Sequence, residues 1–129
     1  LITNCDTFLT IDYADIINFH KKGNFDITVV TSNKIIEIPY GQVTIKNNNH
    51  IIAIKEKPSL PITLNAGLYI INKDLLNLIP KNKKFDATDF INKAINKKFK
   101  IGSYLVPLDN WIEIGKVKDL ENFKKIIDF

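Results

Sequence analysis

A carboxylate, an ammonium and a side-chain amide lie within ten positions of one another near the middle of the sequence. Glu56 and Lys57 follow a short apolar run at residues 51–54, and Asn65 precedes a second run at residues 66–71. Carboxylate and amide oxygens accept hydrogen bonds from hydroxyl groups, and an ammonium attracts phosphate as a point charge. The combination suits a small molecule that carries both hydroxyl and phosphate groups. On spacing alone, a surface salt bridge beside a turn is the simpler explanation.

The two apolar runs are predicted to be strands that position these groups. Both are short, rich in β-branched residues and bounded by turn residues. Pro58 cannot donate to a sheet ladder, so we expect the first strand to end before it and residues 59–64 to form a loop. Glu56 and Lys57 would then lie at the carboxyl end of one strand and Asn65 at the start of the next. Open α/β sheets bind ligands at that edge.

The first third of the chain predicts a βαβ unit. Residues 1–5 have the pattern of a buried strand ending at Asp6, and residues 26–31 have that of a second strand. Between them, Asp12 is a predicted N-cap for an amphipathic helix that closes at Gly23. Parallel strands joined in this way need helices over both faces of their sheet. His20, on the apolar side of the helix, is predicted to be a half-buried packing residue rather than a ligand.

A β-hairpin is predicted over residues 35–54. Two apolar stretches flank the turn-prone triplet Asn47-Asn48-Asn49. The tripeptide Pro39-Tyr40-Gly41 interrupts the first hairpin strand, and Gly41 would let a ligand or a second backbone come close. A simple bulge explains the same glycine.

The remainder of the chain alternates helices and strands. Asn72 and Asp86 are predicted N-caps of two helices, the first ended by Pro80. Strands are predicted at residues 101–106 and 111–114. Gly115 leads into a last predicted helix with one apolar side: Val117, Leu120, Phe123 and Ile127. Because no repeat or linker is visible, residues 1–129 are expected to form a single domain.

Composition excludes some functional classes. The net charge of +4 is modest and the lysines are scattered, whereas nucleic-acid binders concentrate theirs on one face. The sequence contains no apolar run of about eighteen residues, which is the length that would predict a membrane span. The single cysteine, Cys5, excludes an internal disulfide and fits a reducing, cytoplasmic compartment. The sequence starts inside a strand-like run without an initiator methionine, so we expect it to be a piece of a longer protein.

Five short motifs occur in the order and approximate spacing found in the sugar-1-phosphate nucleotidyltransferases, which the chain resembles over essentially its whole length. They are Asn4-Cys5-Asp6, where the family usually has Asn-Gly-Asp, followed by Pro39-Tyr40-Gly41, Glu56-Lys57-Pro58, Asn65-Ala66-Gly67-Leu68-Tyr69 and Trp111-Ile112-Glu113-Ile114-Gly115. The forms of the second and third motifs incline the resemblance towards the mannose-1-phosphate guanylyltransferase-like branch.

The resemblance implies a fold and a reaction. The fold would be α/β, a three-layer Rossmann-like nucleotidyltransferase (GT-A-like) fold that is present in part, with a mixed sheet and a β-hairpin insertion. In the implied reaction, a sugar 1-phosphate attacks the α-phosphorus of a nucleoside triphosphate, and pyrophosphate leaves. Because anions must meet anions, catalysis is mostly positioning and charge neutralisation, in which Mg²⁺ takes a large part.

Roles for individual residues also follow from the resemblance. Asp6 and Glu113 would hold Mg²⁺, and Lys57 would bind the sugar phosphate. The remaining substrate-binding candidates are Tyr40, Gly41, Glu56, Asn65, Gly67, Thr88 and Trp111.

Two departures from the family pattern affect the expected activity. Glu113 stands where the family has aspartate, and its extra methylene adds roughly 1.5 Å of reach, while Mg²⁺ demands about 2.0–2.1 Å to each oxygen. The family's glycine-rich Gly-x-Gly-Thr-Arg-Leu loop, which cradles the triphosphate, has no counterpart in the sequence. We therefore expect this chain alone not to turn over.

Three classes of function stay open at this point. The first is the acceptor half of a sugar-1-phosphate nucleotidyltransferase, and the second is a non-catalytic sugar-phosphate-binding or regulatory relative. The third is a basic module that interacts with nucleic acid or protein, supported by charge alone. A homo-oligomer is also open, because a sheet cut in mid-fold leaves an edge that favours pairing.

Overall fold

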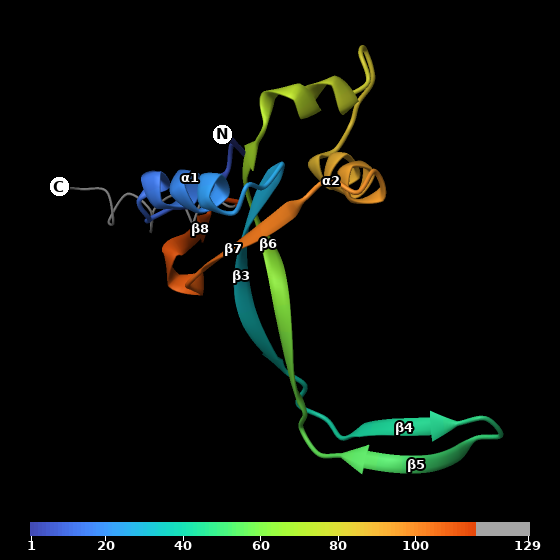
Figure 1. Cartoon of the computed structure of the whole chain (residues 1–129). Coiled ribbons are helices and arrows are strands. Elements are labelled where there is room, and N and C mark those ends of the chain that lie inside the picture. Colours follow the sequence, from blue (N-terminus) through green and yellow to red (C-terminus); the bar gives the residue numbers. More distant parts are fainter. Residues whose placement is uncertain (116–129) are drawn as a thin grey trace.

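The longest strand, β6 (Ser59–Ile71), runs through a four-stranded mixed sheet and continues beyond it (Figure 1). The strand order is β1 (Ile2–Thr3), β6, β3 (Ile27–Glu37), β7 (Ile101–Val106). β6 is antiparallel to both β1 and β3, whereas β3 and β7 are parallel. The computed structural model describes residues 1–115.

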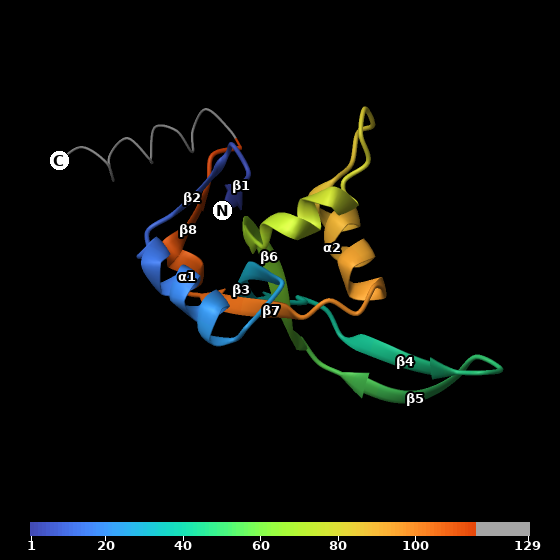
Figure 2. The ribbon, with the colours of Figure 1, turned by 45° about the horizontal axis from the view of Figure 1, so that its top comes forward.

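Helices cover both faces of this sheet, as Figure 2 also shows. On one face lie α1 (Tyr13–Lys22) and a two-stranded ribbon of β2 (Thr7–Leu9) and β8 (Trp111–Glu113), the latter preceded by the 3₁₀ turn η2 (Leu108–Asn110). On the other lie α2 (Ala87–Asn96) and the 3₁₀ helix η1 (Lys73–Leu78). The predicted three-layer α/β architecture with a mixed sheet is confirmed.

Each face has its own hydrophobic core, because residues alternate between the faces along each strand. The core beneath α1 and the ribbon comprises Leu9, Ile16, Val30, Ala66, Leu68, Ile70 and Val106. The core beneath α2 and η1 comprises Ile27, Leu75, Phe90 and Ala94. The two cores fix β6 and β3 from both sides, and these are the strands that carry the candidate site.

Helix α1 begins and ends as predicted. The Asp12 carboxylate accepts a hydrogen bond from the Ala14 amide at 2.8 Å, and the Gly23 amide donates to the Phe19 carbonyl at 2.9 Å. The N-cap positions of the later helices are also occupied by the predicted residues, Asn72 and Asp86, but neither side chain makes a capping hydrogen bond.

The environment of His20 differs from the half-buried position expected for it. The side chain is buried, with its Nδ1 atom 2.9 Å from Thr28 Oγ1 and its Nε2 atom 3.1 Å from Asn72 Oδ1. Both ring nitrogens are therefore engaged in joining α1 to β3 and to the end of β6. The histidine is a structural link with no ring nitrogen left for a ligand.

The predictions for the N-terminus need correction. Residues 1–6 are exposed rather than buried, and the strand among them, β1, has only two residues. β1 and β3 do run in the same direction, but β6 lies between them, and the parallel neighbour of β3 is β7. The expected adjacent βαβ pair is therefore wrong. β1 is exposed because it forms an edge of the described sheet.

The predicted loop at residues 59–64 is instead the first half of β6. It pairs with β3, which runs on to Glu37 rather than ending at residue 31. Pro61 is tolerated because β1 pairs with β6 only at Leu68 and Tyr69, so the proline has a free strand edge on one side.

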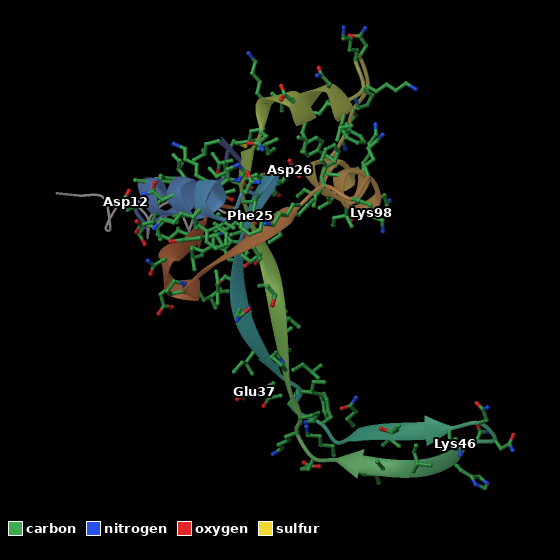
Figure 3. All side chains as sticks on the ribbon, in the orientation of Figure 1. Asp12, Phe25, Asp26, Glu37, Lys46 and Lys98 are labelled. Atoms are coloured by element: carbon green, nitrogen blue, oxygen red, sulfur yellow. The ribbon has the colours of Figure 1, made fainter. Side chains whose placement is uncertain are left out.

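The predicted hairpin is confirmed, and it extends the paired ends of β3 and β6. It consists of β4 (Gln42–Lys46) and β5 (His50–Lys55), with positive φ angles at Asn48 and Asn49 in the turn. Figure 3 shows Glu37 at the end of the β3–β6 pair and Lys46 far out on the hairpin. We call residues 35–61 the arm.

The C-terminal predictions are met in part. Strand β8 matches the predicted strand at residues 111–114, whereas the helix predicted around Val117, Leu120, Phe123 and Ile127 lies outside the described residues. No helix in the described part of the chain has the length and apolar character needed to cross a bilayer.

Candidate functional site

The β2–β8 ribbon brings the backbones of the two acidic residues singled out in the sequence close together. In this antiparallel pair Thr7 is opposite Glu113, and the Ile114 amide donates to the Asp6 carbonyl at 2.8 Å. Asp6 therefore lies opposite Ile114, so Asp6 and Glu113 are diagonal neighbours across one ladder.

This pair of carboxylates is a donor set that suits a hard divalent cation. Asp6 is part of a turn in which the Thr7 amide approaches the Asn4 carbonyl at 3.4 Å, so its side chain is not bound by strand alternation. Within residues 1–115 no three His, Cys, Asp or Glu side chains gather as a metal-binding group. Mg²⁺ is commonly held by only one or two carboxylates, with phosphates and water completing the octahedron, and the residues present fit that pattern.

A glycine lets the Asp6 turn approach β6. The Asn4 amide donates to the Gly67 carbonyl at 2.9 Å, and Gly67 has a φ of +74°. A Cβ atom there would lie 2.6 Å from Asn4 Nδ2 and 3.2 Å from Thr7 Oγ1. Glycine is thus required both for the backbone conformation and for the close approach. Its role here is to hold the segment carrying Asp6 against the sheet.

Asn65 is fixed at the same place by two hydrogen bonds. Its Oδ1 accepts from the Gly67 amide at 3.0 Å, and its Nδ2 donates to the Tyr69 hydroxyl at 2.8 Å. The amide keeps one N–H and one lone pair for a ligand. A pre-oriented amide of this kind binds a hydroxyl group without ordering itself first.

Asn65 and Thr88 share a hollow between β6 and α2. It measures about 210 Å³ and is lined by Val29, Asn65, Thr88, Ile91 and Asn92. Two of its three polar residues, Asn65 and Thr88, were predicted from the sequence, whereas Asn92 was not. The helical spacing of residues 88 and 92 is the signal that would have added it.

Trp111 and Glu113 line a second hollow of about 240 Å³ on the opposite face of the sheet. Its other lining residues are Lys34, Leu64 and Leu108. Trp111 also packs against the core beneath α1, and its Nε1 is a buried donor without a hydrogen-bond partner in the described structure. Lys34, an ammonium in the same hollow as Glu113, was missed in the sequence because β3 was expected to end before it.

The remaining predicted residues lie apart from this group. Glu56 and Lys57 form the bend between β5 and β6, and the six-residue step from Ser59 to Asn65 along β6 is about 20 Å. The expectation that Glu56 and Lys57 share a sheet edge with Asn65 is therefore wrong, because residues 59–64 are strand rather than loop. Residues that are close in the sequence are separated here in space by an extended strand.

A second group of predicted residues does gather at the base of the hairpin. A Cβ atom at Gly41 would lie 3.2 Å from Glu56 Oε2, so Gly41 and the Glu56 carboxylate are neighbours. Lys57 lines a hollow of about 480 Å³ with Glu37, Ile38, Pro39 and Ser59. Tyr40 is largely exposed beside them.

Comparison with known proteins identifies the family. A family model described as nucleotidyl transferase matches residues 1–128. The chain belongs to the nucleotidyl transferase family. It is 28% identical over 123 residues to the mannose-1-phosphate guanylyltransferase catalytic subunit beta of Dictyostelium discoideum, covering 92% of this chain and 33% of that protein. It is 31% identical over 134 residues to a glucose-1-phosphate adenylyltransferase of Halalkalibacterium halodurans, with the same coverage of 92% and 33%.

Solved structures agree on the fold. HddC from Yersinia pseudotuberculosis matches with a TM-score of 0.61 at 20% identity, over 95% of this chain and 52% of that one. The chain spans about a third of the length of the two curated relatives described above. The predicted resemblance to nucleotidyltransferases is confirmed.

The Gly67 contact leads to a prediction about stability. Gly67→Ala should lower the free energy of unfolding by at least about 1–2 kcal/mol, the cost of a left-handed conformation for a residue with a Cβ atom. Urea unfolding followed by circular dichroism measures this difference.

Gly115→Ala is the matched control, because a Cβ atom at Gly115 would meet no atom within 4 Å. Equal stability of the two variants would contradict the close approach of the Asp6 turn to β6.

Proposed function

We propose that this chain is the sugar-phosphate- and metal-binding part of a sugar-1-phosphate nucleotidyltransferase. In this reaction an oxygen of the sugar phosphate attacks the α-phosphorus of a nucleoside triphosphate, the bond to the β-phosphate breaks, and pyrophosphate leaves. The observation that most supports the proposal is the β2–β8 ladder, which joins Asp6 to Glu113 within a chain of this family.

Asp6 and Glu113 are the proposed ligands of Mg²⁺. The cation, when bound, neutralises phosphate charge, which allows two anionic substrates to approach. Glu113 carries the longer side chain expected to need a backbone adjustment for the short Mg²⁺–oxygen distance. The Ile114–Asp6 hydrogen bond keeps the two backbones in register while that adjustment occurs.

A sugar 1-phosphate would bind across the open edge of β6. Its ring would lie by Asn65 and Thr88, and its phosphate would lie towards Glu113 and Trp111 on the other face. Lys34 lines the latter hollow and is exposed, so its ammonium is available to a phosphate there. Gly67 contributes by holding the Asp6 turn against the same strand.

The residues at the base of the arm would act in the complete enzyme. We assign Lys57 to the sugar phosphate and Glu56, with Tyr40 and the Gly41 backbone, to the sugar, following the family resemblance. Since β6 separates them from Asn65 by about 20 Å, the arm has to change its position relative to the sheet. Contacts that cover its apolar surface would supply the free energy for such a change.

A non-catalytic, sugar-phosphate-binding relative is the second candidate function. It is favoured by Glu113, which stands where the family has an aspartate. The proposed compartment is the cytoplasm, supported by the exposed free thiol of Cys5.

We infer that a second copy of the chain covers the arm. The exposed fractions of Ile35, Tyr40 and Ile54 are 66%, 74% and 67%, and the β4–β5 pair forms a separate two-stranded sheet in the described structure. Free edges of identical strands pair readily, antiparallel about a twofold axis. Homo-oligomer formation would bury these apolar side chains.

The first prediction of the proposed function tests the metal site. Titration calorimetry should detect binding of a sugar 1-phosphate that depends on Mg²⁺, and Asp6→Asn should weaken it about ten- to hundredfold. The estimate corresponds to the loss of an interaction with a charged group, about 1.5–3 kcal/mol.

Asp12→Asn serves as the control, since Asp12 caps α1 away from the ribbon. Binding that is unaffected by chelation of Mg²⁺ would refute the proposed metal role. In the complete enzyme, Glu113→Asp should raise the rate of pyrophosphate release, and a protein without such release before or after the change would be the non-catalytic relative.

A second prediction concerns the two lysines. In the isolated chain, Lys34→Gln should weaken binding of the sugar 1-phosphate about fivefold, because a partly solvated charge–phosphate contact contributes about 1 kcal/mol. Lys57→Gln should leave the affinity unchanged, since Lys57 lies on the arm. The reverse result would mean that the arm is closed over the site in solution.

A third prediction concerns assembly. Sedimentation equilibrium should show an oligomer whose population rises with concentration, and Ile54→Lys should shift it to the monomer by placing a charge on the arm. Ile95→Lys on α2, at a site that is 50% exposed, should leave the oligomer intact. A monomer at all concentrations would exclude pairing through the arm.

A further inference from the structure

The hollow between β6 and α2 contains a polar side chain that no role above uses. Its floor is apolar, formed by Val29 and Ile91, and Asn65, Thr88 and Asn92 supply the polar groups. Its volume of about 210 Å³ is below the roughly 300 Å³ at which sites for drug-sized ligands begin. The size and the lining suit a single small polar ring.

Thr88 and Asn92 are free to bind a ligand, whereas Asn65 is mostly committed. Within residues 1–115, neither the Thr88 hydroxyl nor the Asn92 amide makes a hydrogen bond to another side chain or to the backbone. Both are exposed. The Asn92 amide therefore offers two donors and one acceptor that are satisfied by solvent alone until a ligand arrives.

Helix geometry makes Thr88 and Asn92 act together. They are four residues apart on α2, so they lie one turn apart on the same side of the helix. Phe90 and Ala94 occupy the side that is buried in the core. The buried side anchors the helix, and the hydroxyl and amide are presented next to Asn65 at the rim of the hollow.

We propose that Asn92 is a specificity-determining residue of the sugar site, where its amide binds a ring hydroxyl one turn of helix beyond Thr88. The inference rests on the proposed function and names the group that reads the sugar. A sugar whose hydroxyl points towards Asn92 would gain a hydrogen bond, while its epimer would leave the amide without a partner. Sites that hydrogen-bond a hydroxyl discriminate strongly against ligands that lack it in that position.

The test compares epimers. Affinities of glucose, mannose and galactose 1-phosphates are measured by titration calorimetry with Mg²⁺, for the unaltered chain and for Asn92→Ala and Asn92→Leu. We expect the preferred epimer to bind about tenfold more weakly to both variants, with the other epimers little changed, so that the preference is largely lost. Affinity for inorganic phosphate should not change.

Asn96→Ala is the matched control, because Asn96 lies on the same helix and is exposed but does not line the hollow. Thermal unfolding of each variant verifies that α2 is intact. If the unaltered chain binds a sugar 1-phosphate and neither Asn92 substitution changes the epimer preference, this inference alone is overturned. Failure of the unaltered chain to bind any sugar 1-phosphate would overturn the proposed function and this inference with it.

Discussion

The bulge in β6 is the constraint on which the rest of the site depends. The register pairs Val29 with Tyr69 and Thr31 with Asn65, so three residues of β6 lie opposite one residue of β3. This irregularity places Gly67 in a left-handed conformation, with its carbonyl accepting from Asn4 and its amide donating to Asn65. One local distortion therefore positions both the turn that carries Asp6 and the Asn65 amide that lines the hollow between β6 and α2. Bulges are common beside active sites because they re-aim side chains without breaking the sheet.

Local signals were enough for elements whose ends are set by short-range chemistry. The Asp12 cap, the asparagine turn of the hairpin and the break at Pro39 each act through neighbouring backbone atoms, and each was predicted from the sequence. The extent of β6 was not predicted, because Pro58, directly before the strand, indicated that a loop would follow. The tolerance of Pro61 within β6 depends on a free strand edge, which is a property of the whole sheet.

The candidate site shows the same division between local and long-range information. That Asp6 and Glu113 would act together was predicted from motifs of the family, whereas the ladder that makes them diagonal neighbours was not visible in the sequence. The grouping of Glu56 and Lys57 with Asn65 failed because extended backbone separates residues by about 3.3 Å each. Lys34 and Asn92 were missed since each becomes a site residue only through a tertiary neighbour, Trp111 for one and β6 for the other.

The arm differs from the rest of the described chain in how its side chains are covered. Two hydrophobic cores hold the strands that carry Asn65 and Glu113 and the strand that follows Asp6, so the backbone around these residues is fixed by the chain itself. The arm contributes no residue to either core in the described structure, and its isoleucines other than Ile38 are exposed. Soluble proteins rarely leave such a surface uncovered unless it binds something. The positions of Glu56 and Lys57 are consequently not fixed by packing against either hydrophobic core. In the proposed function, metal and sugar binding would thus be properties of the part of the chain outside the arm, while phosphate binding by Lys57 would require a contact that the arm makes elsewhere.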